Sequence, residues 1–141
     1  MDTLLKTALS QIGIKEIRGA KDNPEVLKYF NALGFNGSKL KDETSWCAAF
    51  INWCLKQACL QYQNTLTARS FLKIGEVVTV PRIGDIVVFW RESKTSWKGH
   101  VALYIREDED FIYCLGGNQG NEVKIARYQK HRVLGYRRIT T

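Results

Sequence analysis

The sequence lacks several features that would place it in other classes of protein. No apolar run approaches the roughly 18 residues that a membrane-spanning helix needs. The N-terminus has no basic segment followed by an apolar core, so we expect synthesis in the cytoplasm without a secretory signal peptide. No two cysteines form a C-x-x-C pair, and their spacings match no usual zinc pattern. We therefore expect no metal, no other cofactor and no disulfide framework.

The composition is that of an ordinary globular protein with a basic end. The chain has 141 residues, of which 45% are hydrophobic and 25% charged, and we expect one domain over residues 1–141. Its net charge is +7, and the segment 120–141 carries six of the basic residues against a single acid, Glu122. A basic surface suits a polyanion, either nucleic acid, anionic lipid or an anionic cell wall. We do not expect nucleic acid as the partner.

Helical patterns fill the first half of the chain. Apolar residues at helical spacing predict a helix over residues 3–12, closed by Gly13. Asn23 and Pro24 open a second helix, which ends at Gly34. A third helix begins near Cys47, with Asp42, Thr44 and Ser45 as candidate N-caps, and its apolar residues on several sides predict burial. Residues 65–72 are expected to add a short fourth helix.

The second half of the chain is rich in strand formers. Short turns separate runs that predict strands over residues 83–90, 101–105, 111–115, 123–128 and 133–138. Successive strands with short links favour an antiparallel meander. Helices followed by strands indicate the α+β class, with the helices packed on a sheet of about five strands.

Cys47 differs from the other cysteines because it lies in the first turn of a helix. Unpaired N–H groups and the positive end of the helix dipole favour a thiolate there. The same N–H groups are placed to receive an oxyanion when a thiolate attacks a carbonyl. The alternative is a buried structural cysteine, which is how we interpret Cys54, Cys59 and Cys114.

His100 supplies a base for this thiol. It opens an apolar strand, whereas the chain's other histidine, His131, lies in a charged turn and is expected at the surface. A base of this kind needs its second ring nitrogen held by a polar group. Asn118 follows the strand that is expected to pair beside His100, and Gln119 is the neighbouring candidate. The alternative for both amides is a simple turn, which the surrounding glycines explain.

Four motifs occur in an order that resembles one family. They are Trp46–Phe50, Gly84–Phe89, Gly99–Val101 and Gly116–Gln119, and the likeness extends from about Leu4 to Arg138. The sequence resembles the NlpC/P60 and CHAP group of papain-like cysteine peptidases and amidases, and in particular its small bacterial and phage members. The resemblance implies a papain-like fold in which N-terminal helices pack on a C-terminal sheet or half-barrel.

The same resemblance implies a peptidoglycan hydrolase. Cys47 would be the nucleophile, His100 the general base and acid, and Asn118 the orienting residue, with Gln119 kept as its substitute. Trp46 and Trp97 would line a substrate groove, with Glu16 and Glu43 as further candidates near the cleft. Asp85 would fix the loop leading into its strand and would not be catalytic.

Two other classes of function remain open on the sequence. One is a non-catalytic module that binds the cell wall or another partner, and the other is a thiol acyltransferase or deamidase acting on protein. For the hydrolase, we expect action in the periplasm or cell wall, after release as a phage-type lysin or delivery as an antibacterial effector. An effector would imply an immunity protein that covers the cleft.

Overall fold

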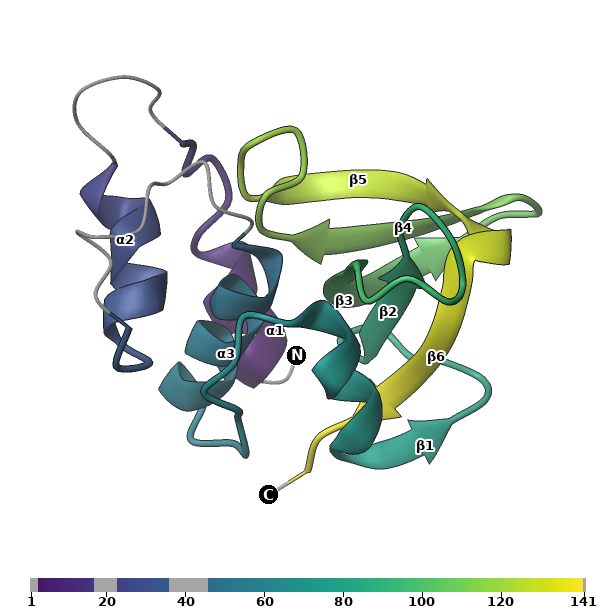
Figure 1. Cartoon of the computed structure of the whole chain (residues 1–141), viewed down its shortest axis with the longest axis horizontal. Helices are drawn as coiled ribbons and strands as arrows, with labels where there is room; N and C mark the ends of the chain where they lie inside the picture. The colour runs from purple at the N-terminus through teal and green to yellow at the C-terminus, as the bar shows by residue number, and fades with distance from the viewer. Residues whose placement is uncertain (1–2, 17–22, 36–45, 141) are drawn as a thin grey trace.

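The computed structural model describes residues 3–16, 23–35 and 46–140, and it places the helices on one side of a curved sheet (Figure 1). The helical elements are α1 (Thr3–Leu9), α2 (Pro24–Asn31), α3 (Cys47–Gln57), and the 3₁₀ helices η1 (Ala68–Lys73) and η2 (Lys130–Arg132). The predicted first helix ends three residues early, because the chain turns before Gly13, whose φ is +100°. The expected fourth helix is the 3₁₀ element η1, which lies slightly later in the chain.

Local signals account for the ends of α2 and α3. Asn23 caps α2, since its side chain accepts a hydrogen bond from the Glu25 N–H at 2.9 Å, and Pro24 follows as the first helical residue. At α3, Trp46 occupies the N-cap position without a side-chain cap bond. The candidate caps Asp42, Thr44 and Ser45 lie outside the described residues.

The sheet is antiparallel, and its strand order is β1-β6-β2-β3-β4-β5. Its strands are β1 (Glu76–Val78), β2 (Ile86–Trp90), β3 (Gly99–Glu107), β4 (Phe111–Gly116), β5 (Lys124–Gln129) and β6 (Val133–Arg138). Strands β2 to β5 form the expected meander, but β6 does not continue beside β5. It returns to pair with the free edge of β2, whose backbone N–H and C=O groups would otherwise lack partners.

The curl of the sheet creates two buried layers. The first lies between the helices and the sheet and includes the buried side chains of α3, which are distributed around that helix as predicted. The second lies on the other face, where Phe89, Tyr104 and Cys114 pack with Tyr128 and Tyr136. Both faces of β2 are therefore buried, as expected for a half-barrel.

Asp85 has the structural role expected for it. Its carboxylate is 4% exposed and accepts the Arg82 N–H at 2.7 Å, which fixes the turn before β2. It also accepts two hydrogen bonds from the guanidinium of Arg138, at 2.8 and 2.7 Å. One buried carboxylate thus ties the start of β2 to the end of β6. Among the described residues, no helix is long and apolar enough to cross a membrane.

Candidate active site

The two central residues of the site stand at the starts of neighbouring elements. Cys47 is the first residue of α3 and is 3% exposed, while His100 is the second residue of β3 and is 6% exposed. Helix α3 packs directly against β3. The positions of Cys47 and His100 are those anticipated from the sequence, and the fold brings the two side chains together.

Gln119 holds the imidazole ring of His100. Its Oε1 lies 2.9 Å from His100 Nε2, and the Gln119 side chain is 1% exposed. The side-chain N–H groups of Gln119 donate to the carbonyls of Cys114 and Lys124, at 3.1 and 2.7 Å. Because both donors are committed, the amide can present only its oxygen to the ring. His100 Nε2 therefore carries a hydrogen, and Nδ1 is left to face Cys47.

Asn118, the residue first expected in this role, is not the partner of His100. Its backbone has φ +58°, the left-handed conformation that asparagine tolerates in turns, and its side chain is only half-buried. This turn directs the next side chain, that of Gln119, into the molecule. Gly116 leaves room for the Gln119 side chain, since a Cβ at position 116 would lie 2.7 Å from Gln119 Oε1.

The environment of His100 favours its charged form. Burial is the largest influence and lowers the pKa of His100, but the charge of Cys47 and a hydrogen bond with it raise the pKa, as does the bond to Gln119. The net effect is a pKa raised above the ordinary histidine value. The attraction is mutual, so the imidazolium also stabilises the Cys47 thiolate.

Two aromatic rings stack near the imidazole of His100. His100 stacks on Tyr128 of β5, with ring centroids 4.8 Å apart and planes inclined by 28°, and Phe89 of β2 lies 6.3 Å away. Sequence reasoning missed Tyr128. The only available signal was its place on a strand whose alternate residues face inward.

A cleft of about 210 Å³ opens beside the nucleophile. Trp97 is 74% exposed and lies in the lining of this cleft, and its role toward a substrate stays a prediction. The same expectation for Trp46 is wrong, because that side chain is fully buried, stacks on Tyr29 and donates to Glu16 at 2.9 Å. Glu16 is thus engaged behind the nucleophile, and Glu43 lies outside the described residues. The cleft is lined by Cys47, Leu66, Thr67, Ala68, Arg91, Trp97, Lys98 and Gly99.

The other cysteines are separate from this chemistry. Cys54 and Cys114 are buried as expected, and burial raises the pKa of both thiols well above the ordinary value. Cys59 contradicts the prediction, because it is exposed. It lies beyond the end of α3, in a left-handed turn with φ +58°, so it leaves the apolar face of the helix.

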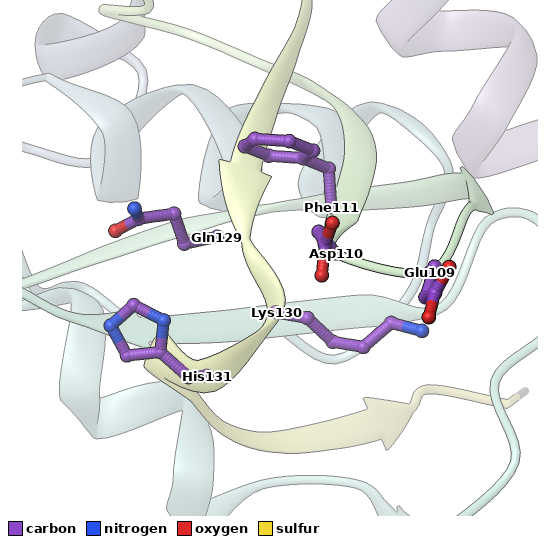
Figure 2. Close-up of a pocket in the computed structure, with 6 residues that line it drawn as sticks. All are labelled: Glu109, Asp110, Phe111, Gln129, Lys130 and His131. Atoms are coloured by element: carbon purple, nitrogen blue, oxygen red, sulfur yellow. The ribbon is translucent and has the colours of Figure 1, made fainter.

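A second hollow, of about 580 Å³, lies at the turn between β3 and β4 and the end of β5 (Figure 2). Neither Cys47 nor His100 lines it. Figure 2 shows the side chains that do, which are Glu109, Asp110, Phe111, Gln129, Lys130 and His131. Within the described residues, no three His, Cys, Asp or Glu side chains are grouped so as to hold a metal ion.

The arrangement at Cys47 suits attack on a carbonyl. The first hydrogen bond of α3 runs from the Phe50 N–H to the Trp46 carbonyl at 2.9 Å, so Ala48 and Ala49 have no acceptor within the helix. N–H groups in the first turn of a helix point beyond its start and can stabilise a negative charge there. The site therefore brings together a thiol, an imidazole held in one orientation and backbone N–H groups at the start of a helix.

Both the sequence and the fold of this chain are similar to those of known proteins. A family model described as the CHAP domain matches residues 39–118, a segment that contains Cys47 and His100 and ends just before Gln119. A solved Staphylococcus aureus protein, described as similar to a lipoprotein of the NLP/P60 family, shares the fold with a TM-score of 0.55 and 16% identity. The alignment covers 99% of this chain and 41% of that protein. No curated protein matches the sequence.

Proposed function

Because this chain belongs to the CHAP domain family, whose members are hydrolases associated with peptidoglycan, we propose that it cleaves an amide bond in the peptidoglycan stem peptide. The observation that carries the proposal is the connected set formed by Cys47, His100 and Gln119. The orienting amide is Gln119 in place of Asn118, so the thiol mechanism is of the Cys-His-Gln type.

Cleavage begins with attack of the Cys47 thiolate on the amide carbonyl. A C–S bond forms, and the carbonyl oxygen gains a negative charge that N–H groups at the start of α3 receive. His100 then gives its Nδ1 proton to the amine nitrogen as the C–N bond breaks, which releases the amine and leaves a thioester.

Hydrolysis of the thioester restores the enzyme. Neutral His100 accepts a proton from water, the resulting hydroxide attacks the thioester carbonyl, and the C–S bond breaks to free the acid and the thiolate. The ring keeps one orientation throughout, because Gln119 holds Nε2 while Nδ1 exchanges the proton.

Digestion of purified peptidoglycan tests the proposal. We expect new soluble fragments whose masses identify the cut bond and so distinguish an N-acetylmuramoyl-L-alanine amidase from an endopeptidase. Cys47→Ala should abolish cleavage, whereas Cys54→Ala, which removes a buried thiol outside the site, should retain it at a temperature where both variants are folded. Undiminished activity in Cys47→Ala would show that this thiol is not the nucleophile.

The same experiment separates the other classes of function. A non-catalytic wall-binding module would sediment with peptidoglycan and release no fragments, and a thiol acyltransferase or deamidase would modify protein and leave the wall intact. The connected site favours an enzyme over a binding module, since binding alone requires no base held against a thiol. We propose the cell wall as the place of action, reached by lysis or by effector delivery.

A further inference from the structure

One wall of the catalytic cleft is a loop whose backbone is held by hydrogen bonds from a neighbouring arginine. Residues 91–98 connect β2 to β3, and Arg69 of η1 binds three of their carbonyls. Its guanidinium and Nε donate to the oxygens of Ser93, Lys94 and Lys98, at 2.8, 2.7 and 2.8 Å. Because Arg69 spends its donors on the backbone of this loop, the loop has a defined shape without a bound ligand.

The described residues give the cleft positive charge. Its lining includes Arg91 and Lys98, and no Asp or Glu among the residues that the structure describes. Lys98 is already neutralised in part, since its Nζ lies 2.7 Å from Glu92 Oε1. Within the described part of the chain, the guanidinium of Arg91 has neither an ion pair nor a hydrogen bond, although the residue is exposed at the cleft.

Arg91 is close enough to the catalytic ring for its charge to be felt there. Its positive charge lowers the pKa of His100, in opposition to the effect of Cys47. Among the described residues this guanidinium meets only the charge of its neighbour Glu92, without a hydrogen bond or salt bridge, and it lies at the cleft, so an anion there could bind it. Trp97 stands exposed on the same loop and offers an apolar face beside this charge.

We propose that Arg91 binds a carboxylate of the substrate, so that the enzyme selects acidic peptides over their carboxamide forms. The inference rests on the proposed function for the nature of the substrate, and it names the chemical class that the cleft accepts. A carboxylate on Arg91 would form charge-assisted hydrogen bonds next to the scissile amide, and Trp97 would cover the adjacent apolar part of the peptide.

The anion site is first tested without any peptide. In a Cys59→Ser background, which removes the exposed thiol, Cys47 is alkylated with anionic iodoacetate and with neutral iodoacetamide. We expect Arg91→Gln to lower the ratio of the two rates by roughly tenfold, the effect of losing one charged hydrogen-bond donor. Lys94→Gln removes a matched positive charge from an exposed position of the same loop and should leave the ratio near the parental value.

The substrate preference is then measured on solubilised peptidoglycan fragments and on the same fragments after carbodiimide amidation of their carboxylates. The parental protein should cleave the acidic fragments at least about tenfold more efficiently, and Arg91→Gln should lose only that advantage. Equal losses on both substrates, or an unchanged iodoacetate ratio, would overturn the proposal. Absence of cleavage of either substrate would instead refute the hydrolase function, while the alkylation ratio would still report on the anion site.

Discussion

Substitution of Gln119 is the sharpest test of how the base is held. Gln119→Met keeps most of the side-chain volume but removes the acceptor for His100 Nε2 and the donors to two buried carbonyls. If each of these three groups costs about 1 kcal/mol when left unsatisfied, unfolding should require roughly 3 kcal/mol less. The imidazole would also lose the bond that sets its tautomer, and we expect kcat/KM to fall about 100-fold, or about 2.7 kcal/mol.

Asn118→Gly provides the matched control. Glycine adopts the left-handed backbone of this position without strain, so the substitution removes the amide side chain and its contacts without changing the turn. Peptidoglycan cleavage and urea unfolding are measured for both variants at one pH, and Asn118→Gly should stay within about threefold of the parental activity. The reasoning is refuted if Asn118→Gly loses the activity while Gln119→Met retains it.

Three further predictions follow from contacts elsewhere in the chain. Cys47→Ala should lower the pKa of His100, because it removes the charge and the hydrogen bond of Cys47, which raise that pKa, and leaves in place the burial that lowers it; histidine NMR titration would show the shift, and an unchanged pKa would contradict the interaction between the two side chains. Arg138→Met should reduce the free energy of unfolding by roughly 2–4 kcal/mol, because it leaves the buried Asp85 carboxylate with the Arg82 N–H but without its counter-ion; adding Asp85→Asn should recover much of the loss in urea unfolding, and an unchanged stability of Arg138→Met would contradict the pair. Cys59→Gly should raise stability by about 1 kcal/mol in thermal unfolding, since glycine removes the cost of the left-handed turn; a lower melting temperature would argue against strain there.

Local sequence signals were sufficient to predict the elements that carry Cys47 and His100. Asn23 and Pro24 start α2 through interactions with their immediate neighbours, and apolar periodicity marks α3 and β3. Cys47 and His100 could therefore be placed at the starts of their elements. Their approach required only that α3 pack on the sheet, which the α+β pattern favours.

Neighbouring residues in the sequence could not show whether Asn118 or Gln119 holds the imidazole of His100. It depends on the backbone conformation at residue 118 and on carbonyls of Cys114 and Lys124, which two paired strands bring to the same place. Trp46 is a similar case, because its burial depends on Tyr29 from another helix. A sequence pattern records which side chains are present but not which partners from distant elements surround them.

Several cations of the basic C-terminal segment make contacts within the fold, which affects how its positive charge is interpreted. Arg138 binds Asp85, Arg137 donates to the Leu72 carbonyl at 3.2 and 2.9 Å, and Lys130 pairs with Glu107. These cations hold β6 and its neighbours in place, so much of the excess charge is committed within the fold. Electrostatic attraction to an anionic wall would then depend on the cations that remain uncommitted.

Close packing around Gly117 links the fold to the chemistry. A Cβ at this position would lie 2.7 Å from Phe50 Cβ and 2.8 Å from the Trp46 ring, so only glycine lets the turn approach α3 so closely. The turn carries Gln119 and the helix carries Cys47, and His100 lies between them. The separation of Cys47 and His100 thus depends on the same contact that closes the core, because a shift of either element would open a void or create a clash. This is why a thiol, an imidazole and an amide from three separate elements can form one connected site.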